Sequence, residues 1–288
     1  MPRIHSILAS ATTRSLKKAM KNEIIHGELP ANALAQLQHA KETLEHKGWA
    51  DRLTELVGAP ITASLNMLPK AAAEAVQAAV DKALQAALSV AMQTLGKEVS
   101  ENKPRLLTHK ILASLTGAAG GAFGLTTAAI ELPVSTVLIL RSVADIARSE
   151  GEDLNQVETR LACLEVLAID GGSKSNINDN TEIGYFAVRA AMSKQVADAS
   201  KYVIQHGVSD SAAPPMIRLL GVISKRFGVV VNEKLTAQAI PIIGAFGGAL
   251  INAYFIDHYQ DLARAHFTIR RLEREFGEGL VRSEYARL

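Results

Sequence analysis

The sequence predicts an all-α protein, a multi-helix domain built around a central pair of glycine-rich helices. Apolar residues recur at three- and four-residue spacing along most of the chain, which is the period of an amphipathic helix. Alanine is abundant and aromatic residues make up only 5% of the chain, a composition that favours helix over strand. No run alternates apolar and polar residues between turn signals, as a half-buried strand would. The 288 residues are enough to bury a large core.

Two parts of the chain differ in character. Residues 1–57 are polar, helical in pattern and rich in histidine, and residues 58–288 form the predicted main helical domain. Within the first part, His39, Glu42 and His46 share a helix face. Because the segment carries many charges, this face is predicted to be solvated and not to form a binding site.

The first helices of the main domain are predicted from the spacing of apolar residues and from the positions of proline and glycine. The stretch between Pro69 and Gly96 predicts an amphipathic helix, and an uncharged run follows at residues 111–130. Proline suits a first helical turn, so the next helix is expected to begin at Pro133 and to stop at Gly151. The apolar run VLIL inside it keeps helical spacing, as does GVVV at residues 228–231.

The later helices follow the same signals. Helices are predicted over residues 154–169, 182–205 and 216–229, with a loop at 170–180. The run from Pro241 to Ile256 is predicted to be a core helix. The change of polarity at Asp257 would mark where it leaves the core or lines a polar cavity, and a frayed tail is expected from about Gly277.

A short pattern occurs twice, which suggests an internal duplication. GAFG at 121–124 is followed by DIAR at 145–148, and GAFG at 244–247 is followed by DLAR at 261–264. Glycines four residues apart can let another helix backbone approach closely; the pairs are Gly117 with Gly121, Gly120 with Gly124, and Gly244 with Gly248. No glycine-rich stretch carries the glycine-lysine-serine/threonine ending of a phosphate-binding loop.

The sequence is compatible with three environments for the two glycine-rich runs. They approach the roughly 20 residues that span a bilayer, but polar residues and glycine dilute both. A hairpin buried within a soluble protein is favoured over a region lying in or on a membrane, and true spanning helices are the third alternative.

Charged residues follow each glycine-rich run on one helix face. Asp257, Asp261, Arg264 and Arg271 share a face, as do Arg141, Asp145 and Arg148. The simpler interpretation is local ion pairing, Asp145 with Arg148 and Asp261 with Arg264, worth about 0.3–0.5 kcal/mol per pair. The alternative is that both rows meet in a partly buried network or bind an anionic head group.

Other polar residues give weaker signals. His266 falls on an apolar stripe and is predicted to be a core-edge histidine, while Cys163 is predicted to be an inert buried thiol. Glu165 lies between apolar positions, so it is expected to be buried with a partner, Arg141 or Arg189. No cofactor or metal is expected. The alternative metal site would use Asp257, His258, Asp261 and His266, although their spacing is not that of helical ligand pairs.

Long stretches resemble the EcsC protein family: TGAAGGAFGLTTAAIELPVSTVLILRSVADIARSEGEDL (116–154), ACLEVLAIDGG, TEIGYFAVRAA and the segment 240–274. The resemblance covers about residues 55–276 and leaves 1–54 outside. The loop IDGGSKSNINDN departs from the family's shorter segment. The positions most typical of the family are Glu131, Pro133, Arg141, Asp145, Arg148, Gly151, Glu165, Gly184, Tyr185, Arg189, Gly244, Asp257, His258, Asp261, Arg264, His266 and Arg270. The resemblance implies a link to membrane transport and no established activity.

Composition and pattern together lead to an expected function. The net charge of +2 and the lack of a basic stripe argue against nucleic acid. The single cysteine and the lack of a signal-like apolar segment at the start favour the cytoplasm. The two uncharged glycine-rich runs suggest a place peripheral to the inner membrane. We expect a non-enzymatic protein that binds lipid or a membrane-protein partner, such as a transporter, through the glycine-rich hairpin; the alternative is a metal-dependent hydrolase with Glu131 or Glu165 as base. The expected binding residues are Glu131, Arg141, Asp145, Arg148, Asp257, Asp261, Arg264 and Arg270.

Overall fold

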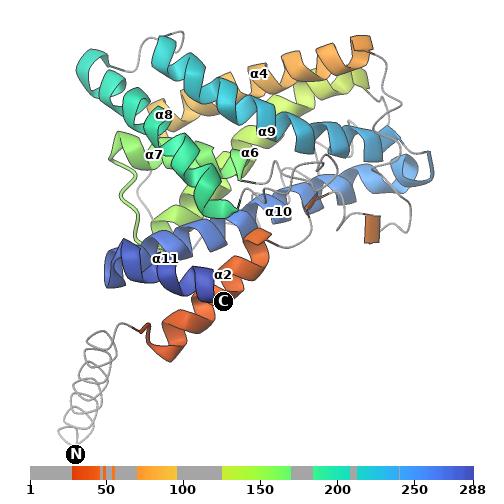
Figure 1. Cartoon of the computed structure of the whole chain (residues 1–288). Helices are drawn as coiled ribbons and strands as arrows, with labels where there is room; N and C mark the ends of the chain where they lie inside the picture. Colours follow the sequence, from red (N-terminus) through yellow and green to blue (C-terminus); the bar gives the residue numbers. More distant parts are fainter. Residues whose placement is uncertain are drawn as a thin grey trace, which may run out of the picture. The chain divides into compact units, whose positions relative to one another are not determined.

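The computed structural model of the chain describes residues 28–45, 48–49, 54–55, 70–95, 125–169, 184–207, 213–239 and 241–288 (Figure 1). Regular structure in these residues is helical and none of it is strand, so the predicted all-α class is confirmed. The elements in order are α2 (Ala31–Glu45), α4 (Lys70–Gln93), α6 (Leu125–Ser149), α7 (Val157–Glu165), the 3₁₀ turn η3 (Val166–Ala168), α8 (Tyr185–His206), α9 (Pro214–Ala239), α10 (Pro241–Phe276) and α11 (Glu278–Arg287).

The chain divides into two compact units, which we describe separately. The smaller unit comprises residues 1–43 and 265–288, with α2, the end of α10 and α11. The larger unit comprises residues 44–264 and holds the other helices and the first part of α10. The predicted division at residue 57 stays a prediction.

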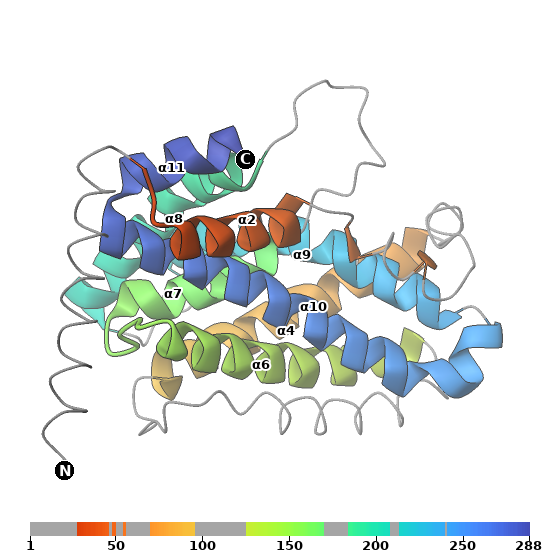
Figure 2. The same ribbon diagram turned by 90° about the horizontal axis from the view of Figure 1, so that it is seen from below.

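The larger unit is organised around α4. This helix packs against α6, α7 and α9, while α8 packs against α7 and α9. Figure 1 shows α4 beside α9, and the view from below in Figure 2 shows α6 running along α4. Val80, Leu84 and Leu88 recur every four residues on α4 and are almost fully buried, as a helix with a wide apolar stripe requires.

In the larger unit, arginine side chains donate hydrogen bonds to backbone carbonyl groups in the last turns of two helical segments. Arg160 Nη1 donates to the carbonyl oxygen of Met92 at the end of α4 (2.9 Å), and Arg226 Nε donates to that of Ala168 at the end of η3 (2.5 Å). The last carbonyls of a helix have no partner within the helix, and its C-terminus carries partial negative charge. These bonds satisfy those carbonyls and join α7 to α4 and α9 to η3.

In the smaller unit, a lysine side chain likewise bonds a carbonyl oxygen near the end of a helix. Lys41 Nζ on α2 donates to the carbonyl oxygen of Tyr285 near the end of α11 (3.0 Å) and lies 5.1 Å from the centre of the Tyr285 ring. Val281 and Tyr285 are buried. The predicted frayed tail after Gly277 is therefore wrong, because α11 carries apolar side chains that this unit buries.

Two predicted helix boundaries are also wrong. The helix α6 begins at Leu125 and continues through Pro133, although its predicted stop at Gly151 is confirmed by a left-handed φ of 81° just after the helix. The helix α9 extends to Ala239, past the predicted end at residue 229, because Val230, Val231 and Leu235 continue its buried stripe. The runs VLIL and GVVV are helical, as predicted.

Of the two alternatives predicted for Asp257, the exit from the core is wrong, and the polar cavity stays a prediction. The helix α10 is continuous for 36 residues, from Pro241 to Phe276. Asp257 is partly exposed, but its neighbours His258, Tyr259 and Gln260 are buried. Asp257, Asp261 and Arg264 share one face of the helix, and the buried side chains between them lie on its other faces.

The glycine-rich helix pair lies largely outside the described residues. Gly117, Gly120, Gly121 and Gly124 fall outside them, as does the loop at 170–180. Gly244 and Gly248 belong to α10, but the structure does not describe what packs against them. The pairing of the two runs and the duplication therefore stay predictions. None of the described helices has the length and apolarity needed to cross a bilayer.

Replacing Pro133 tests the position of the start of α6. A proline inside a helix costs about 3 kcal/mol relative to alanine, because it lacks an N–H and its ring clashes with the preceding turn. We expect Pro133→Ala to raise the free energy of unfolding by about 1–3 kcal/mol in urea denaturation. The matched control is Pro214→Ala at the first residue of α9, where proline is well suited. That change should lower stability by less than about 1 kcal/mol. If Pro133→Ala lowers the free energy of unfolding as the control does, the helix begins at Pro133.

Candidate functional site

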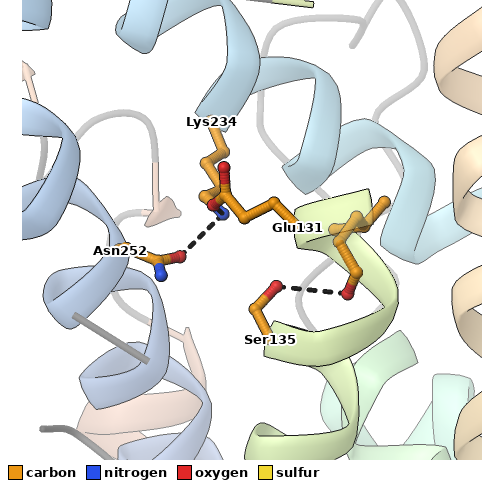
Figure 3. A network of polar contacts seen from close by, with 5 residues as sticks. Glu131, Ser135, Lys234 and Asn252 are labelled. Atoms are coloured by element: carbon orange, nitrogen blue, oxygen red, sulfur yellow. Dashed lines mark hydrogen bonds and ion pairs between the residues drawn. The ribbon is translucent and has the colours of Figure 1, made fainter. Parts of the chain in front are cut away.

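A buried lysine joins three helices of the larger unit. Lys234 on α9 is only 1% exposed. Its Nζ donates to Oε1 of Glu131 on α6 (2.9 Å) and to Oδ1 of Asn252 on α10 (2.8 Å), as Figure 3 shows for the side chains. Glu131 and Asn252 are themselves buried. We call these three residues the Lys234 clamp, because one ammonium group holds a side chain from each of two neighbouring helices.

Helical spacing places these polar side chains in the core. Lys234 lies on the buried stripe of α9 that includes Ile223, Phe227 and Val230, at steps of four, three and four residues. Asn252 precedes Phe255 and Tyr259 on the buried stripe of α10 in the same way. The backbone of each helix thus carries a polar group to a position where an apolar one would normally lie.

Aromatic rings enclose one side of the clamp. The Nζ of Lys234 lies 4.9 Å from the centre of the Phe255 ring, within the range of a cation–π contact. Phe255 in turn packs against Trp49, Phe227 and Tyr259 with ring centres 5.2–6.2 Å apart. The charge is therefore held beside an apolar aromatic cluster, a setting in which electrostatic interactions are stronger than in water.

Burial and charge pairing act on Lys234 in opposite directions. Burial lowers the pKa of the Lys234 ammonium, because removal from water disfavours the charged form. The charge of Glu131 and its hydrogen bond raise the pKa and oppose that effect, but burial is the larger cause. Glu131 and Asn252 offset part of the cost of burying this cation.

The ammonium of Lys234 is well satisfied by the protein. It has three N–H donors, of which two bond to Glu131 and Asn252, and the Phe255 ring face adds a third contact. Ser135, one turn after Glu131, donates instead to the carbonyl oxygen of Leu132 in its own helix (3.1 Å, Figure 3). Chemically, this arrangement suits a device that holds helices together.

The predicted local ion pairs exist on both helices. Arg148 Nη1 bonds Oδ1 of Asp145 at 2.9 Å, and Arg264 Nη1 bonds Oδ1 of Asp261 at 2.6 Å. The two pairs differ in burial, with side chains 14–18% exposed on α6 and 44–47% exposed on α10. Similar sequence words, DIAR and DLAR, thus produce the same contact in two environments.

The remaining predicted binding residues have separate partners. Arg141 Nη2 donates to Oγ1 of Thr94 just after α4 (3.4 Å), and the Arg270 guanidinium lies 6.0 Å from the centre of the Phe267 ring. Glu131 belongs to the Lys234 clamp, and Asp257 is partly exposed. A common anion site formed by these residues stays a prediction.

The candidate metal residues give no geometric support for an ion. In the described part of the chain, no three His, Cys, Asp or Glu side chains gather in an arrangement that could hold a metal. His266 is fully buried, deeper than the predicted core edge, and His258 is buried as well. The metal site at Asp257, His258, Asp261 and His266 stays a sequence-based hypothesis.

Two further expectations concern α7. Cys163 is a buried free thiol, and Glu165 is buried, so both predicted locations are confirmed. The proposed pairing of Glu165 with Arg141 or Arg189 stays a prediction. In the first part of the chain, His39 and Glu42 are exposed, as the solvated-face interpretation predicts, while His46 lies outside the described residues.

Sequence reasoning gave neither Lys234 nor Asn252 a role in the site. A signal for Lys234 was present, because it continues the stripe of Ile223, Phe227 and Val230 at helical spacing. A charge on an apolar stripe requires a buried partner of opposite charge. Finding that partner on α6 requires the tertiary structure.

Comparisons with known proteins give one family match. The family model described as the EcsC protein family matches residues 31–272, from the start of α2 to near the end of α10. The match begins earlier than the resemblance from residue 55, so α2 belongs to the family pattern. No curated protein and no solved structure matches the chain.

Removing one partner of the clamp tests its electrostatic role. We expect Lys234→Met to lower the free energy of unfolding by about 3–5 kcal/mol, because it leaves Glu131 buried without its cation. The double variant Glu131→Leu/Lys234→Met should recover most of that loss, since apolar replacement of a whole buried pair is often neutral or stabilising. Chemical denaturation of both variants measures the coupling; equal losses in the two would contradict it.

The same double variant provides a pH control for the clamp. The folded-state pKa of Lys234 is lowered, so between that value and about 10.4 the unfolded chain binds more protons. The stability of the wild type relative to the double variant should therefore rise as pH rises through this range. A difference that falls with pH would mean that the folded state holds the proton more tightly.

The paired words DIAR and DLAR allow a matched test of burial. Asp145→Ala removes the more buried pair and should cost about 1–3 kcal/mol, because Arg148 loses a partner in a partly desolvated place. Asp261→Ala removes the exposed pair and should cost only about 0.3–0.5 kcal/mol. Thermal and urea unfolding of the two variants provide the comparison, and a larger loss at Asp261 would refute the account.

Proposed function

The chain belongs to the EcsC protein family, and from that premise we propose that it is a non-enzymatic, cytoplasmic protein that binds lipid at the inner face of the membrane. Its contact with lipid would be the glycine-rich hairpin, whose described part is the first half of α10. In this role the protein lies on the membrane surface, and a membrane-protein partner is the alternative occupant of the same contact.

One observation carries the proposal. Residues 241–256 of α10 contain no charged side chain, and Leu250 within them is 60% exposed. An exposed leucine on an uncharged helix is suited to the boundary between head groups and acyl chains. The partly exposed Asp257, Asp261 and Arg264 follow directly and would lie in the polar head-group layer.

The Lys234 clamp supports the proposal by fixing this helix. Asn252 lies two residues after Leu250 and is bonded to Lys234, so the apolar segment is held on a rigid scaffold. A preorganised contact loses less conformational entropy on binding than a flexible one. No observation in the described residues favours the metal-dependent hydrolase, which stays a hypothesis.

Vesicle binding by a Leu250 variant tests the proposal. Burying one leucine contributes about 1.5–3 kcal/mol, so Leu250→Asp should weaken co-sedimentation with phosphatidylcholine vesicles by at least about tenfold. The matched control is Leu288→Asp, which changes another exposed leucine, at the end of the chain, and should bind as the wild type does.

Two outcomes would contradict the proposal. Wild-type protein that stays in the supernatant with every vesicle composition would remove lipid binding. Binding only to native membranes, and not to vesicles of the same lipids, would assign the contact to a membrane protein instead.

A further inference from the structure

Two of the most exposed large apolar side chains of the described residues flank the connection between α8 and α9. Ile204 is 72% exposed and lies two residues before the end of α8, and Ile217 is 56% exposed and lies in the first turn of α9. The two helices pack against each other, and Figure 1 shows the end of α8 near the start of α9. Both isoleucines therefore lie at one end of a helical hairpin.

The exposed surface of these two helices is basic. Lys194 and Lys201 on α8 and Arg218 and Lys225 on α9 are exposed, against one exposed acidic residue in their described span, Asp198. Four exposed cations and one exposed anion give this surface a net charge of +3. Positive charge is thus concentrated on this hairpin.

The exposed face of α9 combines these charges with small and apolar residues. Ile217, Gly221, Lys225 and Val229 recur every four residues and are all exposed. A Cβ added at Gly221 would meet no atom within 4 Å, so this face opens to solvent. The opposite face, with Leu219, Ile223 and Phe227, is in the core.

We propose that this α8–α9 hairpin is a docking surface for an anionic lipid bilayer. Its isoleucines enter the boundary between head groups and acyl chains, while its lysines and arginine meet lipid phosphates. An exposed apolar pair flanked by cations has the chemistry of an interfacial membrane contact. The inference rests on the proposed membrane function and specifies the lipid class, and it uses residues other than those of the α10 contact.

Charge dependence of vesicle binding by the full chain tests the inference. Wild-type protein should bind vesicles containing phosphatidylserine more tightly than vesicles of phosphatidylcholine alone, with the difference shrinking as salt is added. The double variant Lys201→Glu/Arg218→Glu should bind the anionic vesicles at least about tenfold more weakly, because each substitution replaces attraction with repulsion. The control Lys82→Glu, an exposed lysine on α4, should have a clearly smaller effect.

The apolar part of the surface has its own variant. Ile204→Ser/Ile217→Ser should weaken binding to both vesicle types by about tenfold, and unchanged circular dichroism and thermal unfolding would show that the fold is intact. Equal binding of the wild type to both vesicle types, or equal losses for Lys201→Glu/Arg218→Glu and Lys82→Glu, would overturn the inference.

The two membrane proposals fail in different ways. If phosphatidylcholine vesicles still bind and Leu250→Asp still weakens that binding, while phosphatidylserine adds nothing, the α10 proposal stands and the hairpin inference falls. If no vesicle binds, both fall.

Discussion

The buried ammonium of Lys234 is the constraint on which the larger unit depends. A cation out of water is tolerated only where opposite charge and hydrogen-bond acceptors surround it. Here those groups come from α6 and α10, while the lysine comes from α9. Any movement of one of the three helices away from the others leaves a buried charge uncompensated. The interaction therefore specifies their relative register more strictly than apolar contacts, which tolerate sliding.

A second theme is the use of long cationic side chains at helix ends. Arg160, Arg226 and Lys41 each reach a carbonyl oxygen in the last turn of a different helical segment. In each case the bond connects segments that are distant in sequence. It therefore satisfies a carbonyl group and also joins two helical segments. A helical protein with few aromatic side chains can gain specificity in this way, because alanine-rich surfaces offer little shape to distinguish one packing from another.

The fold class was accessible from the sequence, and the details that failed did so for identifiable reasons. Spacing of apolar residues located α4, α7 and α8 closely, because local periodicity reflects burial. The prediction that α6 begins at Pro133 failed because tertiary packing overrode the local preference of proline for a helix start. The predicted exit from the core at Asp257 failed because a change in average polarity was taken for a change of environment, whereas Asp257, Asp261 and Arg264 share one face of α10 and their neighbours His258, Tyr259 and Gln260 are buried.

The candidate site shows the same limit. Glu131 was identified through the family resemblance and the Asp–Arg pairs through spacing, but the partners of Lys234 lie on two other helices and require the tertiary structure. The clamp also bears on both proposed membrane contacts of the larger unit. It bonds Asn252 on α10 to Lys234 on α9, so the proposed α10 contact and one helix of the proposed α8–α9 surface are attached to the same core.

Hydrogen–deuterium exchange of the wild type and Lys234→Met is the most direct measurement of this account. If the clamp holds the first half of α10, amides within residues 241–256 should exchange roughly a hundredfold faster in the variant, while those of α7 change much less. Equal protection of residues 241–256 in both proteins would show that Lys234 does not hold this helix, and the central claim would be wrong.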